Sequence, residues 1–260
     1  MPLIGEGDPP PVELVNAHGS AKVILTCDHA SGVIPRALGS LGLERARLRG
    51  HVCWDIGAAE LGRALSAMLD APLVLAGYSR LVIDLNRGLD DPTLVSVISD
   101  GAIIAGNRNV TAEDKARRAD AFYHPYHDAI DGLIEGFERR GIAPALIPLH
   151  SFTSFLNGRK RPWQFGILWR RDARIAKPLI ERLRARAGLN VGDNEPYSGR
   201  NGCGYSLEAH AEARGLPHAL LEIRQDLIET KEGATGCAGI LAEALAGILD
   251  DAGLYRVRHF

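Results

Sequence analysis

Short apolar runs alternate with longer amphipathic segments along most of the chain, and this alternation limits the folds that the chain can adopt. Apolar runs of about five residues between helix-length segments are typical of strands in a largely parallel sheet that helices cover on both faces. The runs are 23–27, 72–76, 81–85, 145–149, 164–169 and 219–223, and the helical segments are 56–69, 112–140, 175–187 and 235–252. The sequence therefore predicts an α/β fold, a three-layer sandwich with a mostly parallel mixed central sheet.

The longest helical segment, 112–140, carries clear local signals. Thr111 stands in the N-cap position, where a hydroxyl accepts a hydrogen bond from a backbone N–H of the first turn. Pro125 interrupts the segment and predicts a kink or a break. Residues 1–18 are rich in Pro and Gly and predict an irregular leader, so that 19–260 form a single domain.

Composition and charge argue against several classes of partner. The net charge is −2, and the densest basic stretches, 159–161 and 170–171, are short, so we interpret them as solvated surface or local salt bridges. Neither a nucleic acid nor a membrane is an expected partner. The N-terminus lacks the features of a signal peptide, and no apolar run approaches the roughly 20 residues of a membrane span. The four cysteines form no C-x-x-C pair, and we expect a cytoplasmic protein.

Polar residues, most of them ionisable, stand where several of the expected strands end. In α/β sheets of this kind, reactive groups gather at strand ends, so these residues are candidates for one site. They are His29 after 23–27, His150 after 145–149, Glu222 in 219–223, and Arg80, Asp84, Asn86 and Arg87 around 81–85.

The types of these residues point to metal-assisted hydrolysis. Two imidazoles and one carboxylate make an open zinc site, because neutral histidine suits Zn²⁺ and a fourth position is left for water. A carboxylate outside the ligand set is then needed to move the proton of that water. Glu222 suits this role, since burial on an apolar strand raises a carboxyl pKa toward neutrality. Arg80 or Arg87 would hold an anionic substrate by a forked pair of hydrogen bonds.

Four motifs in order carry a resemblance to a known family. They are CDHASG at 27–32, YSRLVIDLNRG at 78–88, LHSF at 149–152 and LLEIRQDL at 220–227. Together they resemble the N-formylglutamate amidohydrolase family, over a region of about 22–250. The DLNR piece is also similar to that of the zinc carboxypeptidase superfamily, which includes aspartoacylase and succinylglutamate desuccinylase. The resemblance implies a zinc carboxypeptidase-like, phosphorylase/hydrolase-like fold.

The resemblance further implies one Zn²⁺ ion per chain, with His29 and His150 as ligands. The carboxypeptidase pattern has a glutamate three residues after the first histidine, but Gly32 stands there in this chain. The third ligand must therefore come from elsewhere. Asp55 is our first choice and Glu60 the second, although Asp55 could instead cap the helix that follows it.

The same resemblance assigns roles to the remaining polar residues. Glu222 would act first as general base and then as general acid, and Arg80 would polarise the acyl oxygen of the substrate. Asn86 and Arg87 would bind the substrate carboxylate, and Ser151 is counted with them. A nucleophilic role for Ser151 is disfavoured, because it lies in no G-x-S-x-G motif.

Two further segments are expected near the site. Residues 123–127 (YHPYH) predict a structural helix that lines the pocket, with His127 a candidate hydrogen-bond donor. The Gly- and Asn-rich loop 194–206 is either a lid or a plain connection. Asp84 is expected to hold one of the two arginines in a buried ion pair.

We therefore expect a zinc-dependent amidohydrolase that cleaves an N-formyl or related N-acyl amino acid. The specific expectation is hydrolysis of N-formyl-L-glutamate to formate and L-glutamate, so the partner is a small anionic substrate. Two alternatives stay open: a zinc peptidase or amidase acting on another small N-acyl or peptide substrate, and a catalytically silent protein that binds a dicarboxylate. The oligomeric state also stays open, between monomer and homodimer.

Overall fold

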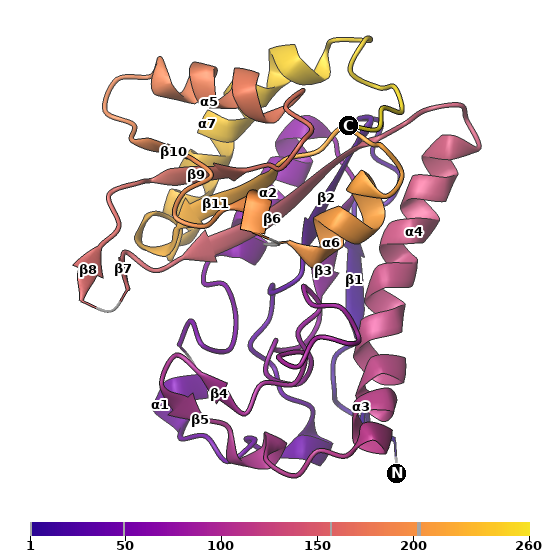
Figure 1. Ribbon diagram of the computed structural model, residues 1–260, viewed down its shortest axis with the longest axis vertical. Coiled ribbons are helices and arrows are strands. Elements are labelled where there is room, and N and C mark those ends of the chain that lie inside the picture. The colour runs from indigo at the N-terminus through magenta and orange to yellow at the C-terminus, as the bar shows by residue number, and fades with distance from the viewer. Residues whose placement is uncertain (1, 49, 157, 202–203) are drawn as a thin grey trace.

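The computed structural model describes residues 2–48, 50–156, 158–201 and 204–260. Within these residues one sheet of seven strands forms the centre of the molecule (Figure 1). In spatial order its strands are β1 (Val12–Val15), β3 (Leu73–Ala76), β2 (Val23–Cys27), β6 (Ala145–Phe152), β11 (Leu220–Arg224), β9 (Phe165–Leu168) and β10 (Val191–Asp193).

The strand directions give a mixed sheet with a parallel centre. β3, β2, β6 and β11 run parallel, β1 and β9 are antiparallel to their inner neighbours, and β10 is parallel to β9. The predicted mostly parallel mixed sheet is thus confirmed. Two small hairpins lie outside it, β4 (Ile98–Ser99) with β5 (Ala102–Ile103), and β7 (Phe155–Leu156) with β8 (Arg159–Lys160).

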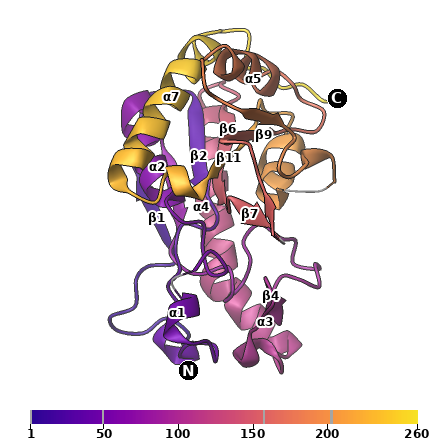
Figure 2. The same cartoon turned by 90° about the vertical axis from the view of Figure 1, so that its left-hand side faces the viewer.

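Helices cover both faces of this sheet (Figure 1, Figure 2). The α-helices among the described residues are α1 (Arg45–Leu48), α2 (Ala58–Leu69), α3 (Ala112–Arg118), α4 (His124–Glu138), α5 (Ala176–Arg184), α6 (Tyr205–Leu207) and α7 (Lys231–Leu249). Side chains of β2 alternate between two cores, as the pleat of a strand requires. Leu25 packs in the core of α2, α5 and α7, whereas Ile24 packs in the core of α4. The fold is therefore a three-layer sandwich.

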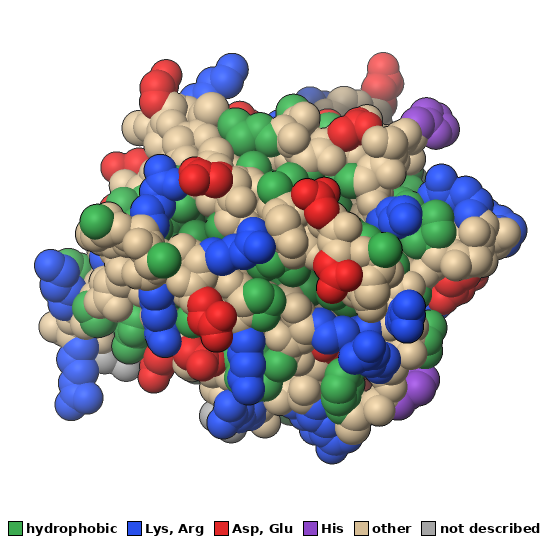
Figure 3. All heavy atoms as spheres, turned by 90° about the horizontal axis from the view of Figure 1, so that it is seen from above, with side chains coloured by type: hydrophobic (Ala, Val, Ile, Leu, Met, Phe, Trp, Pro, Cys, Tyr) green, Lys and Arg blue, Asp and Glu red, His purple; other side chains and the backbone are tan. Residues whose placement is uncertain are grey.

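α7 is long and apolar enough to cross a bilayer, judged by length and composition alone. Its buried residues, among them Ala234, Leu241 and Leu245, belong to the core that α7 shares with α2 and α5. Seen from the end of the molecule above α5 and α7, Lys and Arg side chains are interspersed with Asp and Glu (Figure 3). One face of α7 thus packs into a core of the sandwich.

The helix expected at 112–140 is present as α3, a π-helical turn at Ala119–Tyr123, and α4. Thr111 is its N-cap, as predicted. The Thr111 hydroxyl accepts from the Asp114 N–H at 3.1 Å, and the Asp114 carboxylate accepts from the Thr111 N–H at 3.2 Å, which makes a capping box. The break expected at Pro125 takes the form of the π turn just before it, so that Pro125 lies in the first turn of α4.

The apolar run 81–85 was expected to be a strand, and this prediction is wrong. The run is buried, but its backbone forms turns. Side chains satisfy its carbonyl groups: Asn107 Nδ2 donates to the Leu81 carbonyl and Arg118 Nη1 to the Val82 carbonyl, both at 2.8 Å. A short apolar run indicates burial, and it does not distinguish a buried strand from a buried turn whose polar groups find side-chain partners.

The irregular leader expected at 1–18 also needs correction. Within it, β1 pairs with β3 at the edge of the central sheet. The Glu13 carboxylate accepts from Arg63 Nη1 at 2.8 Å and from Nη2 at 2.6 Å, which ties this edge strand to α2. An antiparallel edge strand needs only one neighbour, so four residues suffice to join the sheet. That 19–260 form a single domain stays a prediction.

The capping box at Thr111 gives a first testable prediction. Thr111→Ala removes the acceptor for the Asp114 N–H and is expected to lower the free energy of unfolding by about 1 kcal/mol. Thr111→Ser keeps the hydroxyl and is the matched control, with an expected loss of less than about 0.5 kcal/mol. Urea denaturation of the three proteins measures both values. Equal stability of wild type and Thr111→Ala would show that the cap contributes nothing.

Candidate active site

The carboxyl ends of β2, β6 and β11 meet at one edge of the sheet and bring the expected polar residues together. His29 follows the end of β2, and His150 lies in β6. Glu222 of β11 is paired in register with His150, so the two side chains leave neighbouring strands on the same face. The order of the parallel strands thus creates the site.

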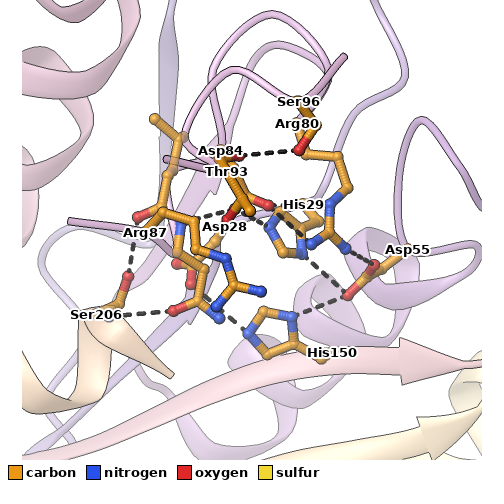
Figure 4. A network of polar contacts seen from close by, with 12 residues as sticks. Asp28, His29, Asp55, Arg80, Asp84, Arg87, Thr93, Ser96, His150 and Ser206 are labelled. Carbon is orange, nitrogen blue, oxygen red and sulfur yellow. Dashed lines mark hydrogen bonds and ion pairs between the residues drawn. The ribbon is translucent and has the colours of Figure 1, made fainter. Parts of the chain in front are cut away.

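His29, Asp55 and His150 form a cluster that could hold a metal ion, because one ligand atom of each lies within 4.8 Å of the others (Figure 4). Asp55 Oδ2 is 3.5 Å from His29 Nδ1 and 2.9 Å from His150 Nδ1. The Asp55 N–H donates to the His29 carbonyl at 2.9 Å and so ties the segment before α2 to the end of β2. Of the two candidates for the third position, Asp55 lies in the cluster, whereas Glu60 is exposed on α2.

The second nitrogen of each imidazole faces another carboxylate (Figure 4). His29 Nε2 is 2.8 Å from Asp84 Oδ1, and His150 Nε2 is 3.6 Å from Asp28 Oδ2. The hydroxyl of Tyr126 on α4 donates to Asp28 Oδ1 at 2.5 Å. Asp28 and Tyr126 were not among the expected site residues. Asp28 stands beside His29 in its motif, but nothing local shows that it turns toward the other imidazole.

Charge within this cluster is balanced between imidazoles and carboxylates. Despite burial, Asp84 and Asp55 raise the pKa of His29 above its ordinary value. Despite burial, Asp28 and Asp55 raise the pKa of His150 well above its ordinary value. Against the effect of burial, positive neighbours hold the pKa of all three carboxyls low. Three buried carboxylates stabilise positive charge placed between them. A divalent cation would supply such a positive charge.

Glu222 stands apart from this balance. It is only 7% exposed, and its Oε2 has no hydrogen-bond partner among the described residues. Burial, with Asp55 adding to it and His150 opposing it, raises the pKa of Glu222 to about 7. A carboxyl group with this pKa exchanges protons readily near neutral pH.

The two arginines and Asn86 lie in or beside the turn region that replaces the expected strand. Arg80 Nη2 donates to Asp84 Oδ2 at 2.7 Å, so Asp84 holds an arginine as expected and a histidine as well. Asn86 Oδ1 accepts from the Ser206 N–H at 3.1 Å, which fixes the orientation of its amide. Arg87 follows on the same turn and reaches the same cavity.

The expected site residues line one cavity of about 200 Å³. A larger hollow of about 410 Å³ between α5 and α7 carries only surface charges around apolar residues, so volume alone does not mark the site. The Ser151 hydroxyl donates to the Ile56 carbonyl at 2.9 Å and lies at the cavity wall. The residues of the wall are His29, Asp55, Arg80, Asn86, Arg87, His150, Ser151, Leu168, Tyr197, Gly204, Leu220 and Glu222.

One side of the cavity is formed by the loop 194–206, of which residues 202–203 lie outside the described part of the chain. Tyr197 of this loop is held by Arg161, whose Nη1 donates to the Tyr197 hydroxyl at 3.0 Å and whose guanidinium lies 4.9 Å from the ring centre. Arg161 is therefore buried, so of the two interpretations of 159–161, solvated surface is wrong for this residue. Its burial depends on Tyr197, which no local sequence pattern indicates.

Comparison with known proteins finds one matching family model and several similar solved structures. The family model for N-formylglutamate amidohydrolase matches residues 21–229. The solved structure of a gene product from Agrobacterium tumefaciens superposes with a TM-score of 0.93 at 34% identity, covering 96% of this chain and 99% of that chain. N-formylglutamate amidohydrolase from Ralstonia eutropha superposes with a TM-score of 0.73 at 23% identity, covering 93% and 98%, which shows a shared fold. No curated protein matches the chain.

The sheet, its site and the family match together define a hydrolase that acts on an amide bond. The chain belongs to the N-formylglutamate amidohydrolase family. The resemblance that four short motifs predicted is thereby confirmed, and the match covers the strands and loops that form the cavity.

The raised pKa of Glu222 predicts a pH-dependent cost in stability for metal-free protein. Its carboxyl keeps a proton to about pH 7 when folded but releases it near pH 4.5 when unfolded. The folded state thus binds more protons in this window, so this residue lowers stability as the pH rises through it, by about 2 kcal/mol between pH 5 and pH 8. Glu222→Gln cannot ionise. Its free energy of unfolding relative to that of wild type is therefore expected to be about 2 kcal/mol higher at pH 8 than at pH 5.

Urea denaturation of chelator-treated proteins at the two pH values measures this gain. Glu60→Gln, at an exposed position, is the control and is expected to show no pH-dependent difference. A gain for Glu222→Gln that is the same at both pH values would mean that Glu222 ionises with an ordinary pKa.

Proposed function

We propose that this protein hydrolyses the amide bond of N-formyl-L-glutamate, with a zinc ion held by His29, Asp55 and His150. Membership of the N-formylglutamate amidohydrolase family supports the substrate. The observation that carries the proposal is the cluster of three potential ligands beside Glu222 in one small cavity.

The geometry of the three ligands suits zinc. Tetrahedral bonds of about 2.0–2.1 Å place neighbouring ligand atoms about 3.3 Å apart, and Asp55 Oδ2 lies 3.5 and 2.9 Å from the two Nδ1 atoms. His29 Nε2 is within hydrogen-bond distance of Asp84 Oδ1, the arrangement that orients a metal-binding histidine and raises its basicity, and His150 Nε2 faces Asp28 Oδ2 at 3.6 Å. When bound, zinc would lower the pKa of a water molecule toward 7 and polarise the scissile carbonyl.

Glu222 is the residue that we assign to proton transfer. Its pKa of about 7 lets it take a proton in one step and return it to the leaving nitrogen in the next. Its Oε2, without a hydrogen-bond partner among the described residues, is available for this exchange. Register pairing with His150 keeps the carboxyl close to the ligand cluster without adding it to the ligand set.

The arginines and Asn86 supply the groups that an anionic substrate requires. Arg80 contacts both Asp84 and Asp55, so its guanidinium is held at the ligand cluster, where it would stabilise negative charge on the acyl oxygen. Asn86 and Arg87 would bind the substrate carboxylate, Arg87 through a forked pair of hydrogen bonds. We assign Ser151 to the cavity wall on the substrate side.

The cavity favours a small N-acyl amino acid over the alternative of a peptide. Its volume is about 200 Å³, below the range of roughly 300–1,000 Å³ that larger ligands occupy. We also propose a cytoplasmic location. Cys27, Cys53 and Cys237 are buried free thiols, whereas Cys203 lies outside the described residues. Proteins of oxidising compartments tend instead to use their cysteines in disulfides.

Removal of a proposed ligand should remove both metal and activity. His29→Ala and His150→Ala are expected to bind clearly less than one zinc per chain and to lose at least about 100-fold in kcat. Glu222→Gln is expected to keep its zinc and still lose about 100-fold or more, since it cannot exchange a proton. Elemental analysis and N-formylglutamate turnover measure the two properties. His124→Ala, at an exposed position, is the control; full activity after chelation would contradict the proposal.

The proposed carboxylate clamp gives a prediction on affinity. Arg87→Ala removes a charge-assisted hydrogen bond of about 1.5–3 kcal/mol and is expected to raise KM by 10-fold or more with little change in kcat. The effect should disappear for the analogue whose α-carboxylate is replaced by an amide. Arg108→Ala, at an exposed position, is the matched control. An equal loss with both substrates would place the clamp elsewhere.

A further inference from the structure

A buried pair of histidines lies outside the metal-ligand cluster, between α4 and the π-helical turn Glu208–Glu212. His127 Nδ1 and His210 Nε2 are 2.7 Å apart, and the ring planes are inclined by only 20° with centroids 5.0 Å apart, so the rings meet edge to edge. The two residues are 8% and 4% exposed. The sequence suggested His127 as a candidate donor to the site, and its partner comes from a distant segment.

The hydrogen bonds around this pair allow its protons to be counted. His127 Nε2 lies 3.1 Å from the Leu85 carbonyl, which only accepts, so Nε2 carries a hydrogen. His210 Nδ1 lies 2.9 Å from Asp131 Oδ1, and Arg214 Nη2 donates to the same oxygen at 2.9 Å. This carboxylate oxygen accepts from the arginine and accepts from the imidazole as well, so His210 Nδ1 carries a second hydrogen. The bond between the rings needs a third, one more than two neutral imidazoles hold.

The surroundings place the extra proton on His210. Burial and the charge of His210 lower the pKa of His127 to about 4, although Asp28 and Asp131 act in the opposite direction. A cation on His210 is paired directly with Asp131, as a buried charge requires. The charged and titratable groups that face the pair are Asp28 after β2, Tyr123, Tyr126 and Asp131 from the π turn and α4, Tyr205 from α6, and Arg214 with its partner Glu138.

The pair supports the turn that carries the proposed substrate clamp. The carbonyl of Leu85 accepts from the histidine pair, and the carbonyl of Arg87 accepts from the Tyr123 hydroxyl at 3.0 Å. On the same turn, Asn86 Oδ1 accepts from the Ser206 N–H. Tyr123 and one histidine of the pair each lie in a π-helical turn, a local irregularity that is frequent at functional sites.

We propose that His127 and His210 hold one excess proton between them and are positioning residues for the segment 85–87, which they keep in the geometry that binds a substrate carboxylate. The second half of this inference rests on the proposed function. When the pair loses its extra proton, one of its three hydrogen bonds must break. The neutral pair keeps one hydrogen on His210 Nδ1 for the Asp131 carboxylate and one between the two rings, so the bond to the Leu85 carbonyl is the one that is lost. The segment 85–87 then loses support, and substrate affinity falls as the pH rises.

Nitrogen NMR of the wild-type protein tests the proton count without any reference to activity. In uniformly ¹⁵N-labelled protein, the short N–H···N bond is expected to give a coupling between nitrogens of two rings, which identifies the pair. We expect three ring hydrogens on the pair at pH 7, with His210 doubly protonated and His127 protonated at Nε2. Two neutral rings at pH 7 would overturn the inference.

Steady-state kinetics tests the positioning role. His210→Gln is expected to raise KM for N-formylglutamate by about 10-fold, with kcat within about threefold of wild type. The analogue with an amide in place of the α-carboxylate should show no such change. His124→Gln, on the exposed side of α4, is the matched control. An unchanged KM, or equal losses with both substrates, would overturn the positioning role.

The variant Asp131→Asn distinguishes a histidine pair that holds an excess proton from a pair that makes only a structural contact. Loss of the negative charge lowers the pH at which the pair gives up its proton, and the rise in KM should move down in pH with it. A KM profile that does not follow the NMR titration would overturn the proposed link. If the enzyme shows no turnover of N-formylglutamate, the proposed function fails while the proton count stands or falls on the NMR result alone.

Discussion

The buried contact between two imidazoles and three carboxylates is the interaction on which the rest of the site depends. Asp28, Asp55 and Asp84 surround His29 and His150 at the ends of the parallel strands. Buried charges are costly unless they are paired, so each group is stable only while the others are in place. The strand order β2-β6-β11 is what brings these groups within reach of one another.

Both helical layers take part in holding this cluster. Asp55 lies just before α2 on one face of the sheet, and Tyr126 of α4 holds Asp28 from the other. The sheet edge therefore works as a rigid frame, whose candidate metal ligands are fixed by elements that pack in two separate cores. Such a frame keeps Glu222 close to the cluster while its desolvation keeps its pKa near neutrality.

The proposed substrate side of the site is built differently, from irregular chain. The turn at 81–87 is buried, and side chains satisfy its carbonyl groups, among them Asn107 and Arg118. Its apolar pattern predicted a strand, because such a pattern reports burial without reporting how the backbone is paired. His127 of α4 and Tyr123 of the π turn before it support the same turn, so the proposed binding groups depend on long-range contacts.

The sequence by itself determined the strands that position the site, because continuous apolar runs mark parallel strands, and it determined the family through four short motifs. It also identified His29, His150 and Glu222 as candidate site residues, since polar residues at the ends of apolar runs can be recognised in a sequence. Only the tertiary structure decided which groups meet. Tyr126 and Asp28 are 98 residues apart, and His210 and His127 are 83 apart. No periodic pattern connects such pairs, because their contact arises from the packing of helices onto the sheet.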